Sequence, residues 1–220
     1  MNNTKDIFAN RKKEVNLFFK KLYIINNRIN SGKKNKIYND DFFKILKSSF
    51  ILILYNLVES TISSAINDIY QKIEDGKYTY KDVISEIKNM WANNKIKSKN
   101  MKTFEIVDDI INSSIVLEKK KLSISGNIDD NKIRNICKEH NITIREKNGE
   151  DLRNIKKNRN HLAHGEYSFT DCSRDLTLDD LRKIKNNVLS FMESILFDIE
   201  QYYNEELFLE KNLNKKDKNK

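Results

Sequence analysis

The segment FILILYNLVEST, residues Phe50–Thr61, carries apolar side chains on almost every face of a helix. A helix that is apolar all round is buried by its neighbours, whereas a surface helix has a single apolar stripe. Apolar residues at helical spacing extend beyond this segment, over residues 42–73. Asp40 or Asp41 is placed to cap the start of this helix, and Gly76 to end it. We therefore predict a long central helix that is covered on all sides.

Apolar residues recur every three or four positions on both sides of this central helix, which predicts further helices. These are expected over about residues 3–29, 80–91, 102–117, 130–140 and 150–164, with a last long helix from a Thr177–Asp180 capping box to about residue 209. The sequence contains no proline, which would break helix interiors, and no segment has a convincing strand pattern. The expected fold is all-α, a bundle of four or more helices.

The length of 220 residues suits one large domain with a sizeable core. We predict a single helical domain over residues 1–210. Residues 94–147 are expected to be an inserted segment before the motif helix at 150–164, and residues 211–220 a disordered basic tail.

Composition narrows the function classes. The net charge of +9 suits a polyanionic partner such as RNA, although the lysines are spread along the chain. The N-terminus has no signal-peptide pattern, and the run Phe50–Val58 is shorter than the about 20 residues of a membrane span. Cys137 and Cys172 have no metal-ligand spacing around them, which is typical of reduced thiols. We expect a cytoplasmic protein with no membrane contact, no metal site and no cofactor.

The segment RNHLAHGEYSF, residues Arg159–Phe169, places an arginine, an amide and two imidazoles at the end of the motif helix. Gly165 occupies the position where a helix end favours a left-handed residue. At about 100° per residue, Arg159 lies in the middle of the apolar arc of this helix. A buried arginine needs a partner or a bound anion. Glu59 is the natural ion-pair partner, because it is the only acid in the most apolar part of the central helix.

Arg159 has a second possible role, because its planar fork can bind a phosphate. RNA cleavage by 2′-hydroxyl attack needs a group that exchanges protons near neutral pH, as an imidazole does, and a cation for the charge on the phosphate. His164 and Arg159 are therefore candidate catalytic residues, and Asn160 could orient the phosphate or His164. The alternative for His164 is an interaction with the last helix carbonyls.

Two other residues of this segment have open roles. His161 could be a second catalytic imidazole, or an exposed residue that assists contact with RNA. Tyr167 could stack on a base or pack on the bundle.

The frame Arg159–Asn160–(three residues)–His164 resembles the Arg-Asn-x-x-x-His signature of the HEPN superfamily, in particular the prokaryotic stand-alone branch found near defence systems. The segments Phe50–Thr61 and Leu122–Ile136 also resemble that branch. The resemblance implies a homodimer in which both copies of Arg159, Asn160 and His164 line one cleft. It also implies metal-independent cleavage that leaves a 2′,3′-cyclic phosphate and a 5′-hydroxyl.

The resemblance further implies a toxin or antiphage-defence effector that an antitoxin or another defence partner holds in check. Not every member of the superfamily is a nuclease. The alternatives are a non-catalytic RNA- or nucleotide-binding HEPN module and a regulatory helical protein.

Overall fold

The computed structural model describes residues 1–31, 39–98, 103–117, 126–146 and 148–213. This part of the chain contains eight helices and no strand, so the all-α prediction is confirmed. The helices are α1 (Asn2–Asn30), α2 (Asp40–Asp75), α3 (Ser85–Ser98), α4 (Thr103–Asn112), α5 (Asp130–Glu139), α6 (Glu150–Ala163), α7 (Phe169–Cys172) and α8 (Leu178–Asn204).

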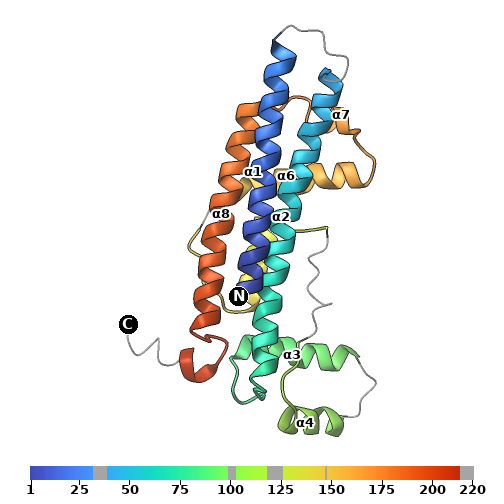
Figure 1. The fold of residues 1–220 in the computed structure, drawn as a ribbon. Coiled ribbons are helices and arrows are strands. Elements are labelled where there is room, and N and C mark those ends of the chain that lie inside the picture. The colour runs from blue at the N-terminus through green and yellow to red at the C-terminus, as the bar shows by residue number, and fades with distance from the viewer. Residues whose placement is uncertain (32–38, 99–102, 118–125, 147, 214–220) are drawn as a thin grey trace.

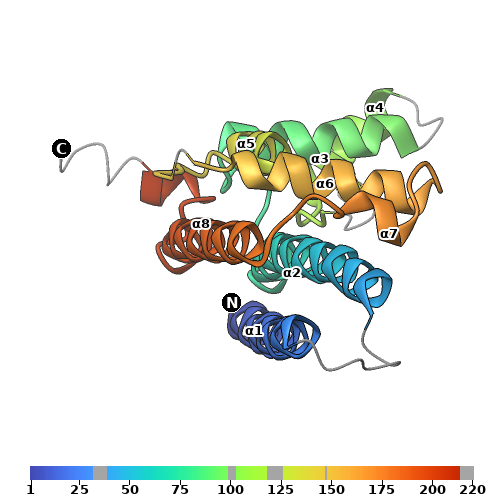
Figure 2. The same ribbon diagram turned by 90° about the horizontal axis from the view of Figure 1, so that it is seen from above.

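The helices form three layers. The long helices α1, α2 and α8 lie side by side, and α1 runs in the opposite direction to the other two (Figure 1). Seen from above, α1 covers one face of the α2–α8 layer, and α6 lies on the opposite face with α5 beside it (Figure 2). The motif helix α6 is therefore separated from α1 by the central layer.

Helix α2 is the central element, as predicted. Its buried side chains point in all directions, and Leu54, Leu57 and Ile66 have no exposed surface. The prediction that Asp40 or Asp41 caps the start is wrong, because the side chain of Asn39 accepts the capping hydrogen bond from the backbone N–H of Phe42 at 2.8 Å. Asp40 and Asp41 instead lie in the first turn, where carboxylates favour the helix dipole.

One described helix, α2, is long and apolar enough to cross a membrane by length and composition, which the run of residues 50–58 alone did not indicate. Of its most apolar window, 61% is buried against other parts of the protein. The central helix of a bundle has the same pattern, so this finding does not indicate a membrane span.

Several predicted helix boundaries are wrong. Helix α3 starts at Ser85 rather than near residue 80, because Asp82 accepts hydrogen bonds from the backbone and the hydroxyl of Thr79 and holds a turn there. It then continues to Ser98, beyond the predicted end near residue 91. Helix α4 ends at Asn112, and the following chain is held by the hydrogen bond from Ile115 N–H to the Tyr78 carbonyl.

Helix α8 ends at Asn204, not near residue 209. Glu206 has a positive φ of 50°, which ends the helix. The chain then turns back so that Phe208 and Leu209 are buried and the Phe208 carbonyl accepts from Ile84 N–H. The Thr177–Asp180 capping box at the start of α8 is present as predicted.

The proposed insertion, residues 94–147, contributes to the common core through its described part. Ile115, Ile128, Ile133 and Ile142 are buried in the same cluster as the α2 side chains. That this segment is an insertion stays a prediction, as does the single domain over residues 1–210. The predicted tail, residues 211–220, lies outside the described residues from residue 214 onward.

His140, which follows α5, is fully buried in this core. Its Nδ1 lies 2.6 Å from the carbonyl oxygen of Ile136, and its Nε2 lies 2.9 Å from the hydroxyl of Tyr70 on α2. Because a carbonyl only accepts, Nδ1 carries the proton and the Tyr70 hydroxyl donates to Nε2. This pair joins α5 to the central helix.

Burial lowers the pKa of His140, which predicts a pH-dependent stability. As the pH falls below about 6.5, the unfolded chain binds a proton that the folded His140 does not, so the folded state loses stability. We expect the free energy of unfolding to fall between about pH 8 and pH 5.5, by at most about 1.4 kcal/mol per pH unit for this one group. Urea unfolding of the wild type and the His140→Gln variant measures it. Equal slopes for the two proteins would contradict the prediction.

Candidate active site

Helix α6 is fixed to the bundle along its first half. Leu152 and Ile155 are buried, as the helical arc predicts. Arg153 pairs with Asp130 at 3.0 Å, and Lys156 pairs with Asp129, at the N-terminal end of α5. Both aspartates are buried, so these pairs hold α6 against α5 and leave its C-terminal end to carry the motif.

The C-terminal end of α6 is closed by Gly165, whose φ of 70° confirms the predicted left-handed residue. The Glu166 N–H donates to the carbonyl of His161 at 2.9 Å, and the Gly165 N–H donates to that of Leu162 at 3.3 Å. This pair of bonds is a Schellman motif. It turns the chain sharply and leaves His164, the last residue before the glycine, exposed.

Arg159 is half-buried between α6 and α2. Its guanidinium carbon lies 5.3 Å from the ring centroid of Tyr55, and Nη1 donates to Oδ1 of Asn160 at 3.2 Å. Burial raises the pKa of the Tyr55 hydroxyl to about 12, so the tyrosine stays neutral under Arg159 at ordinary pH. An arginine over an aromatic face is stabilised by about 0.5–1 kcal/mol when exposed and by more when desolvated.

The Glu59–Arg159 ion pair, one of the two alternatives for Arg159, does not form: the structure has no ion pair between these two described residues. Instead, Glu59 Oε1 accepts a long hydrogen bond, 3.4 Å, from the backbone N–H of Gly126. The Gly126 backbone therefore binds the Glu59 carboxylate, where the ion-pair prediction had expected the guanidinium of Arg159. Among the described residues, Arg159 has an aromatic ring and an amide as neighbours, but no carboxylate bonded to it.

Asn160 and His164 are connected through the helix backbone, because the His164 N–H donates to the carbonyl of Asn160 at 2.9 Å. The side chain of Asn160 is directed to Arg159 and makes no hydrogen bond with the His164 imidazole, both residues being described. That Asn160 orients the phosphate or His164 stays a prediction, and its observed side-chain contact is with Arg159.

His161 is held from two sides. Its Nδ1 contacts the carboxylate of Glu166, and its ring stacks on Tyr167 with centroids 4.5 Å apart. Its Nε2 is shielded from solvent and has no hydrogen-bond partner in the described chain. Tyr167 thus packs on His161 rather than on the bundle. This clasp of His161, Glu166 and Tyr167 folds the segment after His164 back onto the helix, which favours a supporting role for His161.

The segment after the clasp is anchored to α2. Ser48 donates its hydroxyl to the carbonyl of Phe169 at 2.6 Å. The buried Lys47 donates to the carbonyls of Arg174 and Leu176 at 2.8 and 2.7 Å, and burial lowers the pKa of its ammonium group. The turn that carries His164 is therefore fixed on both sides, by α6 and by α2.

Sequence reasoning missed Tyr55, Gly126 and Glu166 as neighbours of the motif. Tyr55 lies four residues before Glu59 and so on the same face of α2, which was a usable signal. Gly126 lies between the predicted helices at residues 102–117 and 130–140, and no local pattern places it at Arg159.

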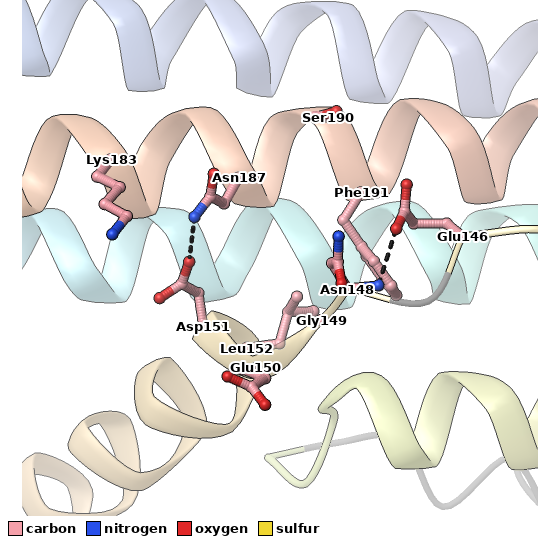
Figure 3. Close-up of a pocket in the computed structure, with 10 residues that line it drawn as sticks. All are labelled: Glu146, Asn148, Gly149, Glu150, Asp151, Leu152, Lys183, Asn187, Ser190 and Phe191. Atoms are coloured by element: carbon pink, nitrogen blue, oxygen red, sulfur yellow. Dashed lines mark hydrogen bonds between the residues drawn. The ribbon is translucent and has the colours of Figure 1, made fainter.

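A pocket of about 380 Å³ lies at the other end of α6, against α8 (Figure 3). Its lining contains the carboxylates of Glu146, Glu150 and Asp151, and the Asp151 carboxylate accepts from Asn187 at 2.8 Å. Lys183 is the only cationic residue among these described lining residues. A phosphate is repelled by such a lining, so this pocket does not extend the candidate site.

A family model described as HEPN_MAE_28990-like HEPN matches residues 2–208. The chain belongs to this HEPN family. The match spans the bundle from α1 to the buried residues after α8, and it includes the whole Arg159–His164 motif. No curated protein and no solved structure matches the chain. The HEPN resemblance seen in the sequence is therefore confirmed at the level of the family.

The absence of an ion pair predicts that Arg159 contributes little to stability. We expect Arg159→Met to lower the free energy of unfolding by no more than about 1 kcal/mol, the value of a partly exposed cation–π contact. Arg145→Met is the matched control, because Arg145 also lies over an aromatic ring, that of Phe197, but pairs with the buried Asp198. It should cost about 2 kcal/mol or more by leaving a buried carboxylate unpaired. Equal losses in chemical denaturation would mean that Arg159 has a counter-charge after all.

Proposed function

We propose that this HEPN protein is a metal-independent endoribonuclease that cleaves RNA by 2′-hydroxyl attack. Arg159, Asn160 and His164 form the site in this proposal. HEPN family membership supports it together with the geometry of these three side chains.

The observation that carries the proposal is the environment of Arg159. A half-buried guanidinium normally has a carboxylate or several hydrogen-bond acceptors. Arg159 has five N–H donors, yet within the described residues it makes one hydrogen bond, to Asn160. A phosphate supplies both the charge and the acceptors that this group lacks.

His164 supports the proposal by its position. It is exposed, it lies at the end of the helix that carries Arg159, and the turn behind it is fixed by the Schellman motif and the clasp. The two residues are five positions apart, about 7.5 Å along the helix axis. We propose that the protein acts as a homodimer, so that each phosphodiester meets groups from both copies.

We propose that the two copies of His164 carry out the two proton transfers. One His164 takes the proton of the 2′-hydroxyl, and the 2′-oxygen attacks phosphorus while the bond to the 5′-oxygen breaks. The His164 of the second copy delivers a proton to the leaving 5′-oxygen. The products are a 2′,3′-cyclic phosphate and a 5′-hydroxyl. Arg159 stabilises the negative charge on the phosphoryl oxygens.

We also propose a setting for this activity, carried over from the sequence resemblance. The protein acts in the cytoplasm as a toxin or antiphage-defence effector, and an antitoxin or defence partner restrains it. The net charge of +9 suits a polyanionic partner such as RNA.

The test is cleavage of a mixed RNA pool in EDTA by the wild type, His164→Ala, Arg159→Lys and the surface control Arg182→Lys. We expect the wild type to leave cyclic phosphate ends. His164→Ala should lose about 10²–10⁴-fold in rate, the usual contribution of a general acid or base. Arg159→Lys should also lose activity because lysine lacks the planar fork. Arg182 pairs with Asp179 on the surface, so its substitution should have no effect.

Other outcomes identify the alternatives. Equal cleavage by the wild type and His164→Ala would contradict the proposed site. RNA binding by the wild type without any cleavage would favour a non-catalytic RNA- or nucleotide-binding module. A lack of RNA affinity even at low salt would favour a regulatory protein, since phosphate contacts give binding that weakens as salt is added.

A further inference from the structure

The terminal nitrogens of Arg159 face Gly126. A Cβ added to this glycine would lie 2.9 Å from both Nη1 and Nη2 and 3.2 Å from Cζ. Because the two terminal nitrogens are nearer than the central carbon, the glycine lies toward the edge of the guanidinium that they form. Because Cα is one bond length from that position, the glycine backbone lies within about 4.5 Å of both terminal nitrogens, in the space that a phosphate bound at this edge would need.

The turn is held there by the same face of α2 that lies under the guanidinium. Glu59 accepts from the Gly126 N–H, and the Tyr55 hydroxyl accepts from the Ile128 N–H at 3.2 Å. Tyr55 also supplies the ring below Arg159. Tyr55 and Glu59, one turn apart on α2, thus position both the ring below the guanidinium and the Gly126 backbone beside its terminal nitrogens.

The remaining donors define how a phosphate can bind. Nη1 donates to Asn160, and the terminal edge is closed by Gly126. The edge formed by Nε and the second hydrogen of Nη2 has no partner in the described part of the protein. The Nε–H and Nη2–H bonds on this edge are parallel, so they can donate together to two oxygens of one phosphate.

We infer that Gly126 is a positioning residue, which closes the terminal edge of Arg159 so that a substrate phosphate binds the Nε–Nη2 edge. This inference rests on the proposed ribonuclease function and adds to it the orientation of the phosphate clamp. Glycine is required for two reasons. The position has a φ of 72°, and a side chain would displace the guanidinium.

The first test is a double-mutant cycle on thermal stability, which does not depend on activity. Gly126→Ala is combined with Arg159→Ala, and each variant is melted alone and together. In the wild-type background, the added methyl group causes backbone strain and a clash with Arg159. In the Arg159→Ala background only the strain remains, so the thermal midpoint should fall less. Equal shifts in the two backgrounds would overturn the contact between Gly126 and Arg159.

The second test is RNA cleavage by Gly126→Ala at a temperature where circular dichroism shows it folded. We expect kcat to fall about 100-fold, as misplacement of a catalytic group by about 1 Å can cost. KM should change far less, because other phosphate contacts remain. Wild-type kcat in a folded Gly126→Ala would overturn the inference and leave the ribonuclease proposal intact. No cleavage by the wild type itself would refute the proposed function, and this inference with it.

Glu59 gives an independent route if Gly126→Ala does not fold. Glu59→Gln keeps an oxygen that accepts from the Gly126 N–H, whereas Glu59→Ala removes it. If Glu59 acts by holding the turn, Glu59→Gln should retain most of the wild-type kcat and Glu59→Ala should lose it. Equal loss in both variants would show that the charge of Glu59 matters rather than the hydrogen bond. Wild-type kcat in both would show that the anchored turn is unimportant. Either result would overturn the inference.

Discussion

Helix α2 is apolar on nearly every face, and covering it determines where the other helices lie. Helix α1 covers one face, and α6 lies on the opposite face of the layer that α2 forms with α8 (Figure 2). Four side chains of α2 contribute to the candidate site. Lys47 and Ser48 anchor the chain after the motif, Tyr55 supports Arg159, and Glu59 holds the Gly126 turn. The core helix is therefore also the scaffold of the candidate site.

The site itself follows from what α2 presents to the end of α6. An aromatic ring stabilises a guanidinium without neutralising it, whereas a bonded carboxylate would satisfy both its charge and its donors. Tyr55 occupies the first role, and the turn at Gly126 uses the acceptor that Glu59 offers. Arg159 is thus held in place without a bonded carboxylate among the described residues. The exposed His164 lies at the C-terminal end of the same helix, where the Schellman motif turns the chain. The segment that follows is anchored to α2 through the Ser48–Phe169 hydrogen bond.

Periodicity was sufficient to predict the long helices, because α2 and α8 depend on apolar residues that are close in sequence. It failed at the start of α3 and the end of α8, where the Thr79–Asp82 turn and the positive φ of Glu206 set the boundaries. The Ile84 N–H then bonds to the distant Phe208 carbonyl. The motif residues were found from local spacing. The partner of Arg159 was not, because the nearest acid in the central helix is not the nearest group in space. Gly126 and Tyr55 come from segments about 70 residues apart, and only the folded chain brings them together.

The central claim is that Arg159 is a fixed cation available to an RNA phosphate. The most direct measurement is the ¹⁵N-resolved signal of its Nε–Hε group while a short oligonucleotide lacking the attacking 2′-hydroxyl is added. We predict a saturable shift of the Arg159 signal that disappears as salt is raised, while the signal of Arg145, which is paired with Asp198, does not move. Binding of the oligonucleotide with no change at Arg159 would contradict the account.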